Sequence, residues 1–398
     1  MDDLFDFFYK ELRKTDLAFY RYLIDEIDWE ERLSAITGAR GTGKTTMILQ
    51  HIKKTFGNSP KEALYVSADN IWFSGNGLFE LANNFEKQGG KYLFIDEVHK
   101  YENWSQEIKN IYDSFSNLKV VITGSSMLQI FKGNADLSRR AVHYVLRGMS
   151  FREFLKFDQN LKFEKISLDD ILQKHIEIAG HINDKIRPLP LLNNYLKYGY
   201  YPYYNSNKRF YHSKLANTVN LVLEVDLPAV ETIEIYSIRK IKKLLWIISQ
   251  SVPFTPKITE LAHYLEVSRN SLLNYLTILE RGALINLLQS STKGISSLAK
   301  PEKIYLNNTN QIFAFESNKP DIGNLRETFF LNQLQAASEV TSAHKADFTV
   351  DNQYVFEVGG KNKGHEQIVG LQNAYLALDN LEYGNGNKIP LWLFGFLY

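Results

Sequence analysis

The sequence predicts an α/β protein that begins with a parallel-sheet domain and continues through a helical region into smaller modules. Three observations predict this class. A glycine-rich loop separates a buried apolar run from an amphipathic stretch, further apolar runs of strand length follow before residue 150, and the later chain mixes helical and strand-like patterns. The 398 residues are enough for two or three compact domains. We expect a sheet domain at 1–150, a helical region at 151–237, a helix-turn-helix module with two strands at 238–306, and an α/β domain at 307–398.

The glycine-rich loop "GARGTGKTT" fits the phosphate-binding pattern G-x-x-x-x-G-K-[ST]. "RLSAI" before it has the character of a buried strand, and "KTTMILQHIKKTF" after it that of an amphipathic helix. In this setting backbone N–H groups surround the phosphates, Lys44 reaches the β and γ oxygens, and the Thr45 hydroxyl ligates Mg²⁺. ATP and Mg²⁺ are therefore the expected cofactors. The expected nucleotide-binding residues are Gly38, Ala39, Arg40, Gly41, Thr42, Gly43, Lys44, Thr45 and Thr46.

An acidic pair follows a later apolar run. "KYLFIDEVH" (91–99) ends in Asp96 and Glu97. We expect Asp96 to hold Mg²⁺ through water and Glu97 to polarise the water that attacks the γ-phosphate. The alternative is an acidic pair on the surface. "DEVH" is also compatible with a DExH helicase, but the other helicase motifs are missing, so His99 is interpreted as a structural residue.

Three more runs complete the expected sheet. "EALYVSAD" (62–69) is a candidate second strand, "LKVVITGSS" (118–126) is another buried strand, and "RAVHYVLRGMS" (140–150) completes the sheet. Open α/β sheets bind ligands at the carboxyl ends of their strands, which is where the small hydroxyls of Thr123 and Ser125 fall. Either hydroxyl is a candidate sensor of the γ-phosphate.

Taken together, "GARGTGKTT", "LFIDEVHKYENW", "ITGSSM", "DLSRRAVHYVLRGMSFREFL" and "YLKYGYYPYY" resemble the AAA-type (AAA_14-like) predicted ATPases with a C-terminal DUF4143-type domain. The resemblance runs over nearly the whole chain and implies a P-loop ASCE/AAA-type sheet with ATPase activity. It also implies an arginine before the fifth strand, the place that Arg140 holds with Arg139 beside it. Either arginine acts as a finger on a neighbouring subunit's nucleotide, or the pair caps a surface. A homo-oligomer is expected under the first interpretation.

The middle of the chain predicts helices and a winged helix-turn-helix. The tyrosines of "YLKYGYYPYY" fit a core better than a base-stacking surface. After a helix at "SIRKIKKLLWIISQSV", the segments "KITELAHYLEVS" and "RNSLLNYLTILERGALI" give helix, turn and helix, and "LINLLQ" and "KIYLNN" give two strands around a polar wing. Residues 257–303 hold six Lys/Arg and four Asp/Glu, so a protein-interaction module is as reasonable as a DNA reader. If DNA binds, the candidate contacts are Arg269, Asn270, Ser271, Asn274 and Lys293.

The last part of the chain resembles the PD-(D/E)xK nuclease fold. The expected order is a helix carrying Glu327, a hairpin with Asp347 and Glu357, a helix at "HEQIVGLQNAYLALD", and a final strand at "KIPLWLFGFLY". Asp347 and Glu357 are the candidates for a second metal site. The active pattern needs a lysine two residues after the glutamate, where this chain has Gly359.

The next lysine, Lys361, begins about 6–7 Å further along the strand. A bulge at Gly359-Gly360 would restore its reach. We expect no efficient cleavage, with an ATP-gated metal-dependent DNA nuclease as the alternative.

Composition limits the remaining functions. The net charge of +1 gives no global attraction to nucleic acid or anionic membrane, and the absence of cysteine excludes disulfides and thiol catalysis. The start "MDDLFDFFYKELRK" is not a signal peptide and no apolar stretch spans a bilayer, so a cytoplasmic protein is expected. The sequence thus predicts an ATPase whose nucleotide state controls C-terminal modules that contact DNA or an unknown protein partner. A nucleotide-bound protein-interaction scaffold without turnover is the other alternative.

Overall fold

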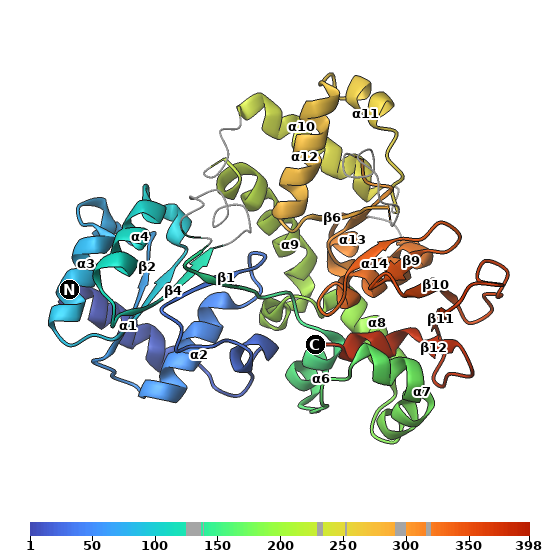
Figure 1. Ribbon diagram of the computed structural model, residues 1–398, viewed down its shortest axis with the longest axis horizontal. Helices are drawn as coiled ribbons and strands as arrows, with labels where there is room; N and C mark the ends of the chain where they lie inside the picture. Colours follow the sequence, from blue (N-terminus) through green and yellow to red (C-terminus); the bar gives the residue numbers. More distant parts are fainter. Residues whose placement is uncertain (125–136, 138, 229–233, 251–252, 291–299, 316–319) are drawn as a thin grey trace. The chain divides into compact units, whose positions relative to one another are not determined.

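The computed structural model describes residues 1–124, 137, 139–228, 234–250, 253–290, 300–315 and 320–398. The chain forms two compact units (Figure 1). Unit 1 holds Met1–Gly148 with Val225–Thr232, and unit 2 holds Met149–Glu224 with Ile233–Tyr398. None of the described helices combines the length and hydrophobicity that a membrane crossing requires.

Unit 1 is built on a five-stranded parallel sheet, which confirms the predicted class for this part of the chain. The order of strands is β2-β3-β4-β1-β5, so β4 lies between β1 and β3. Because β1 pairs with β4 and β5, strands distant in sequence meet at the centre of the sheet. The strands are β1 (Leu33–Thr37), β2 (Ala63–Ser67), β3 (Tyr92–Asp96), β4 (Lys119–Gly124) and β5 (Val142–Val145).

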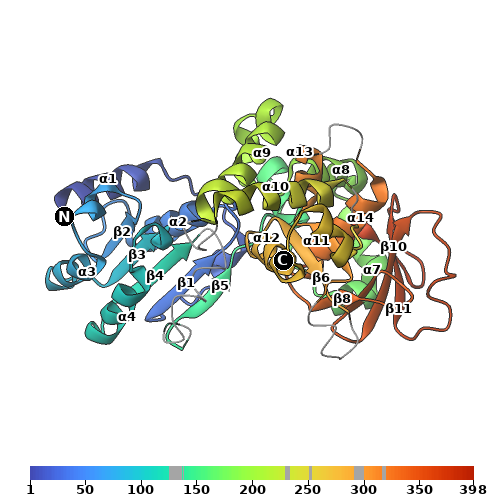
Figure 2. The same cartoon turned by 90° about the horizontal axis from the view of Figure 1, so that it is seen from above.

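Helices cover both faces of this sheet. Helix α1 packs against α2, α3 packs against α4, and the two pairs lie on opposite sides of the sheet (Figure 2). Apolar residues of the helices and strands form one buried core, to which Phe8, Ile48 and Phe94 belong. The core fixes the strand ends from which the polar site residues project. The helices are α1 (Asp2–Lys14), α2 (Lys44–Phe56), α3 (Leu78–Lys87) and α4 (Trp104–Ser114).

Unit 2 begins with helices, as predicted. Ser150 caps the start of helix α6, since its hydroxyl accepts from the Glu153 N–H in a capping box. Four of the six tyrosines of the aromatic segment are at most 4% exposed, so the core interpretation is confirmed for them; they are Tyr195, Tyr200, Tyr201 and Tyr204. Tyr198 and Tyr203 are half-buried, and Tyr211, beyond the segment, is buried. The helices are α6 (Phe151–Gln159), α7 (Leu168–Asn183), α8 (Pro188–Tyr198) and α9 (Tyr211–Leu221), and a π-helical turn follows at Val222–Asp226.

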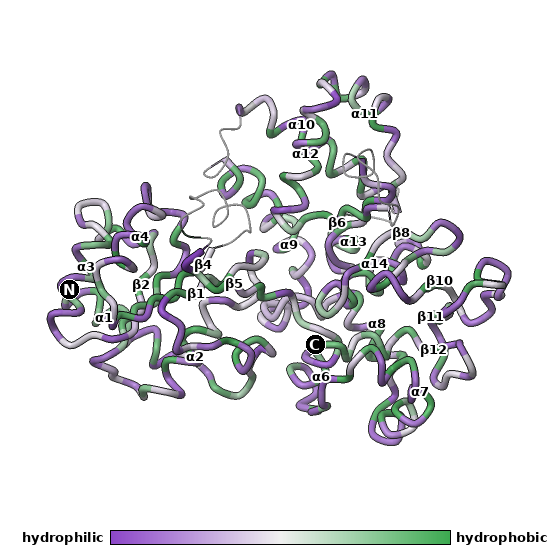
Figure 3. The backbone as a smooth tube through the Cα atoms, in the orientation of Figure 1, coloured by the Kyte–Doolittle hydropathy of each residue, from purple (hydrophilic) through white to green (hydrophobic). Residues whose placement is uncertain are grey.

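Three helices and an antiparallel strand pair follow in the predicted order. Ser268 caps α12 by accepting from the Ser271 N–H, and α12 changes between hydrophobic and hydrophilic residues along the tube in Figure 3, as an amphipathic helix does. Strand β6 pairs with β7. Lys293 lies outside the described residues. The elements are α10 (Ile235–Ser249), α11 (Ile258–Tyr264), α12 (Arg269–Arg281), β6 (Ile285–Leu288) and β7 (Lys303–Leu306).

A second five-stranded sheet ends the chain, in the order β12-β11-β10-β9-β8. Strands β8, β9 and β10 are antiparallel, whereas β10, β11 and β12 are parallel. Helix α14 packs against β10. The elements are α13 (Thr309–Phe315), α14 (Ile322–Leu334), β8 (Val340–Ser342), β9 (Phe348–Val350), β10 (Tyr354–Gly360), β11 (Ala374–Asp379) and β12 (Lys388–Pro390).

Two predicted elements of this sheet are wrong. The helix expected over "HEQIVGLQNAYLALD" is absent: turns lead into β11, because Gly370 (φ 78°) and Asn373 (φ 50°) adopt left-handed conformations that a helix cannot contain. The strand expected over "KIPLWLFGFLY" is limited to β12, after which Leu391–Phe396 form a 3₁₀ helix. The sheet is completed by β11 instead.

Candidate functional site

The phosphate-binding loop joins β1 to α2 and has the conformation that its glycines permit. Gly38, Gly41 and Gly43 have φ values of 155°, 86° and 96°. A side chain at Gly38 would also lie 2.2 Å from the backbone oxygen of Leu146, so only glycine fits there. The backbone of the loop therefore packs tightly against Leu146, the residue that follows β5. A loop that surrounds phosphate with its backbone requires such close packing.

Lys44 begins α2 and is almost completely buried, at 5% exposed. Its ammonium donates to the backbone oxygens of Gly38 (2.9 Å) and Ala39 (3.2 Å). Burial lowers the pKa of Lys44, while the nearby carboxylates of Glu97 and Asp96 oppose this shift. A buried cation held by neutral carbonyl oxygens is poised to exchange them for an anionic partner.

Asp96 ends β3 and is enclosed by hydroxyl groups. Its Oδ2 accepts from the Thr45 hydroxyl at 2.6 Å and from the Tyr65 hydroxyl at 2.9 Å, and its Oδ1 accepts from the Thr123 hydroxyl. The side chain is 2% exposed. Thr45 and Asp96, predicted to share Mg²⁺, are thus in direct contact although 51 residues separate them.

Glu97 has an unusual backbone that directs its side chain. It is left-handed, with φ 49° and ψ 39°, and its N–H donates to the Thr123 hydroxyl at 3.1 Å. The carboxyl Oε2 lies 3.4 Å from His99 Nε2 and accepts no hydrogen bond within the described residues. Burial raises the pKa of Glu97, and Lys44 opposes that shift. Burial also lowers the pKa of His99 to about 4, so His99 is neutral at pH 7.

Thr123 lies in the site, but its hydroxyl already has hydrogen-bond partners and is not free to sense the γ-phosphate. Its hydroxyl contacts Asp96 and the Glu97 N–H, so in this structure it orients the acidic pair. Ser125, the other candidate sensor, lies outside the described residues.

The remaining loop residues have distinct places. Thr42 is buried and its hydroxyl donates to the Ala39 oxygen at 2.9 Å, whereas Gly41, Thr45 and Thr46 are exposed at the start of the helix. Thr42 therefore stiffens the loop and leaves the exposed groups for a ligand.

Three contacts around the loop were not predicted, because they join distant parts of the sequence. Arg21 is buried and donates to the Thr42 oxygen and, at 2.8 Å, to the Arg147 oxygen. Arg40 pairs with Asp226 at 3.2 Å. Tyr65 contacts Asp96, as described above. No local sequence pattern marks these roles: Arg21 lies outside any motif and Tyr65 lies in the middle of β2.

Arg140 lies on the surface of unit 1. Its Nε and Nη2 donate to the two carboxylate oxygens of Asp113 at 3.1 and 3.2 Å, and Arg139 is exposed beside it. The contact matches the surface-cap interpretation. A role as an arginine finger would require this ion pair to break.

The predicted DNA-facing residues sit at the start of α12. Arg269, Asn270 and Asn274 are exposed, and Ser271 is half-buried beside its cap. The structure therefore presents this end of the helix to solvent.

A second group of charged side chains joins β7, α14 and β10 in unit 2. Lys303 contacts Asp347 at 3.1 Å and Glu327 at 3.8 Å, and the Tyr305 hydroxyl donates to Glu327 at 2.8 Å. Burial, followed by repulsion from Asp347, raises the pKa of Glu327 to about 7. Asp347 also accepts from the Val358 N–H at 3.0 Å. We call this group, with Glu357 and Lys363, the carboxylate–lysine cluster.

The lysine of this cluster is not the one that the sequence suggested. Lys361 is exposed, whereas the Lys363 ammonium lies 2.5 Å from Glu357 Oε1. A Cβ at Gly359 would meet the Lys363 stem at 2.8 Å. Lys363 thus covers the position where a side chain two residues after Glu357 would start. Glu357 is 1% exposed, and its Oε2 has no hydrogen-bond partner among the described residues.

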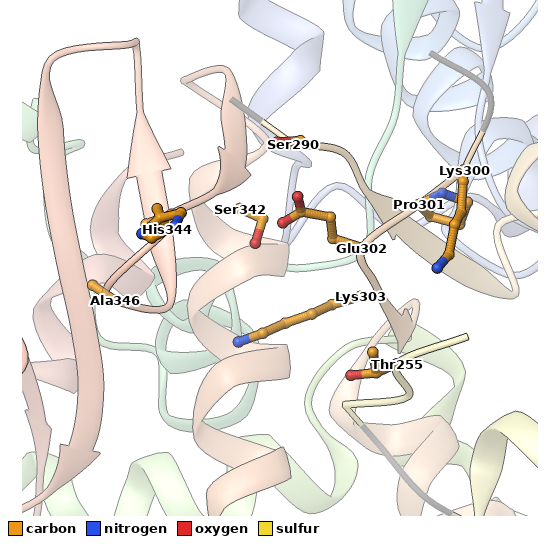
Figure 4. Close-up of a pocket in the computed structure, with 10 residues that line it drawn as sticks. Thr255, Ser290, Lys300, Pro301, Glu302, Lys303, Ser342, His344 and Ala346 are labelled. Carbon is orange, nitrogen blue, oxygen red and sulfur yellow. The ribbon is translucent and has the colours of Figure 1, made fainter. Parts of the chain in front are cut away.

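Lys303 of this cluster also lines a cavity of about 610 Å³ (Figure 4). Lys300, Glu302 and Lys303 enter it from the segment leading into β7, and Ser342 and His344 from the end of β8. Because Lys303 also contacts Asp347, the cavity leads to the cluster. Across the part of the chain that the structure describes, no three acidic or histidine side chains are arranged to hold a metal ion.

Comparison with known families locates two domains. The AAA domain family (AAA_14) matches residues 30–155, which include the loop, the acidic pair and all five strands of the first sheet, so this part of the chain is similar to AAA domains. A domain of unknown function, DUF8612, matches residues 189–312. This match replaces the DUF4143-type domain expected from the sequence.

Two relatives come from Methanocaldococcus jannaschii. The uncharacterized protein MJ1637 is 25% identical over 291 residues, which are 69% of this chain and 61% of that protein. The uncharacterized protein MJ1544 is 26% identical over 375 residues, which are 90% of this chain and 76% of that protein. The chain thus spans about three fifths of the first relative.

Solved structures with partial likeness include AMPPCP-bound DnaA from Aquifex aeolicus, at 14% identity and a TM-score of 0.27, covering 70% of this chain and 88% of that one. Domain III of DnaA from Thermotoga maritima has 13% identity and a TM-score of 0.26, covering 48% and 91%. PCH-2 of C. elegans has 14% identity and a TM-score of 0.23, covering 40% and 45%.

Proposed function

We propose that this AAA-domain protein is a Mg²⁺-dependent ATPase whose nucleotide state controls the modules of its C-terminal half. One observation carries the proposal: Thr45, directly after the loop lysine, donates to Asp96 at 2.6 Å. The hydroxyl that would ligate Mg²⁺ and the carboxylate that would hold the ion through water are therefore in contact, and the charge of Asp96 acts on Lys44.

The residues fit the cofactors by their chemistry. Thr45 would supply a hard oxygen ligand and Asp96 would hold Mg²⁺ through water, and the ion would neutralise charge on the β and γ phosphates. Lys44 exchanges the oxygens of Gly38 and Ala39 for phosphate oxygens, which are stronger partners for an ammonium. Glu97 would accept a proton from the attacking water, and burial, which raises its pKa, makes it a better base.

ATP turnover by purified protein tests this proposal. Phosphate release is measured with Mg²⁺ and with a chelator, on the wild type and on Lys44→Ala. We expect release that needs both Mg²⁺ and Lys44. Tight ATP binding without release would instead support a nucleotide-bound scaffold, and no binding at all would refute a nucleotide site.

We infer that α10, α11, α12, β6 and β7 form a winged helix. The order of the elements and the exposed start of α12 support this inference. The weak local charge predicts modest DNA affinity, so a protein partner is the competing ligand. ATP turnover measured against a panel of single- and double-stranded DNA distinguishes the two, because only a DNA-responsive module changes the rate.

The second candidate function is metal-dependent cleavage of a phosphodiester at the carboxylate–lysine cluster. Lys363 favours it, since this side chain puts an ammonium beside the buried Glu357 despite the glycine at position 359. Asp347 and Glu357 would hold the metal ion, and the ion would supply an activated water. In this structure Lys303 and Lys363 neutralise the same carboxylates, which opposes metal binding.

A cleavage assay decides between this candidate and a domain that does not cut DNA. The substrates are several DNA forms with Mg²⁺ or Mn²⁺, and the variants are Asp347→Ala, Lys363→Met and, as the matched control, Lys361→Met. Cleavage that both of the first variants lose and the control keeps would establish a nuclease. Equal behaviour of all proteins would assign any cleavage to contamination.

A further inference from the structure

A buried aspartate from a distant segment reaches the phosphate-binding loop. Asp226 is 2% exposed and accepts from Arg40 at 3.2 Å, to each of its oxygens, and from Lys100 at 3.0 Å. It lies 186 residues from Arg40 along the chain and 126 from Lys100. The next residue, Leu227, is 1% exposed. The segment Val225–Thr232 belongs to unit 1, although the chain on either side of it belongs to unit 2.

Both partners of Asp226 belong to the nucleotide site. Arg40 lies in the loop, between Gly38 and Gly41, and Lys100 ends the short 3₁₀ helix that follows Glu97. The negative charge of Asp226 also acts on Lys44. It raises the pKa of Lys44, whereas burial, the larger effect, lowers it. Arg40 and Asp226 are therefore within electrostatic range of the groups that face the γ-phosphate.

Asp226 adds negative charge to a cluster that already holds two carboxylates. The charges of Asp226 and Arg40 act on Lys44 and Glu97, as does that of Asp96, and Asp226 also pairs with Lys100. A triphosphate brings several further negative charges to the same place. Asp96 and Glu97 have roles in the proposed reaction, so Asp226 is the anion that the γ-phosphate can replace.

We propose that Asp226 competes with the γ-phosphate of ATP for Arg40 and Lys100. The inference rests on the proposed function, namely that the loop binds ATP. Phosphate oxygens are stronger partners than a carboxylate for a guanidinium, so ATP displaces Asp226. ADP lacks the γ-phosphate and leaves the contact in place. The segment that carries Asp226 thereby reports whether the bound nucleotide is a triphosphate.

The first test compares affinities for MgATP and MgADP by calorimetric titration. Asp226→Asn keeps the shape of the side chain and removes its charge. We expect ATP affinity to rise about tenfold, the effect of one charge-assisted contact, and ADP affinity to change less than about threefold. Glu62→Gln, which removes a surface ion pair with Lys91 in the same unit, is the matched control and should change neither affinity. Equal changes for both nucleotides, or weaker ATP binding, would overturn the proposal.

The second test keeps Asp226, so its result does not depend on whether Asp226→Asn folds. The chain has no cysteine, and Val225 is 46% exposed, so Val225→Cys gives a single site for a fluorescent label. We expect MgATP to change the fluorescence and MgADP to leave it unchanged. If calorimetry shows ATP binding but the label does not respond, the inference fails alone. If ATP does not bind, the proposed function fails with it.

Discussion

Replacing Glu97 by glutamine should leave ATP binding intact and nearly abolish turnover. Glutamine keeps the shape of the side chain, and the N–H contact of residue 97 with Thr123 does not involve the carboxyl group. Affinity should therefore stay within about threefold of the wild type. A positioned general base contributes about 10²- to 10⁴-fold to a rate, so we expect kcat to fall by that factor, or by roughly 3–5 kcal/mol in transition-state stabilisation.

The pH dependence of kcat tests the same role of Glu97 in a second way. Glu97 acts as a base only when deprotonated, and burial raises its pKa above the 4.5 of a free glutamate. The wild-type kcat should therefore fall as the pH drops through this raised pKa, and the residual rate of Glu97→Gln should lack that step. Single-turnover and steady-state phosphate release, with calorimetric ATP titration, measure both effects. Glu102→Gln, an exposed carboxylate in the same segment, is the control. A Glu97→Gln enzyme that turns over at the wild-type rate would refute the assignment.

Four further predictions address the loop, the proposed winged helix and the carboxylate–lysine cluster. Lys44→Ala should weaken MgATP binding about tenfold to a hundredfold, because one charge-assisted phosphate contact is lost; unchanged calorimetric affinity in the folded variant would contradict this. Gly38→Ala should reduce the free energy of unfolding by about 2 kcal/mol more than Gly89→Ala, since both have positive φ but only Gly38 faces a backbone oxygen; urea titration compares them. Any DNA binding should be weak, tolerant of sequence and steeply dependent on salt; a discrete footprint at physiological salt would disprove this. The stabilising contribution of protonated Glu327, whose pKa is about 7 in the folded protein, should be complete below pH 4.5 and lost as the pH rises through 7. Glu327→Gln should remove this part of the pH dependence, which urea unfolding at pH 5 and pH 8 measures.

The nucleotide site was predictable where its signals are local. The loop, the acidic pair and the strands that carry them follow from glycine spacing and apolar runs, and the structure gathers Lys44, Thr45, Asp96 and Glu97 at one end of the sheet. The parallel direction of the strands follows from the same glycine spacing and apolar runs. Thr123 was predicted at the site, but its contact with Asp96 depends on the adjacency of β3 and β4, which no local pattern states.

The unpredicted parts depend on contacts across long separations or on single backbone angles. Asp226 is one acid among many in the sequence, and only its burial against Arg40 distinguishes it. Lys363 reaches Glu357 because the chain turns after β10, a turn that strand geometry alone does not foresee. The helix expected over residues 365–379 is absent because Gly370 and Asn373 are left-handed, and the last six of these residues form β11 instead.

The sheet order has a consequence for how the protein is made. Strand β4 fills the space between β1 and β3, so residues 1–100 contain the loop and the acidic pair without the strand that joins them. Since chains emerge from the N-terminus, this sheet can close only after residues 119–124 have been synthesised. Asp226 arrives about another hundred residues later. During synthesis there is therefore an interval in which the loop can be complete and its own aspartate is still absent, and a nascent chain in that interval should bind ATP more tightly than the finished protein.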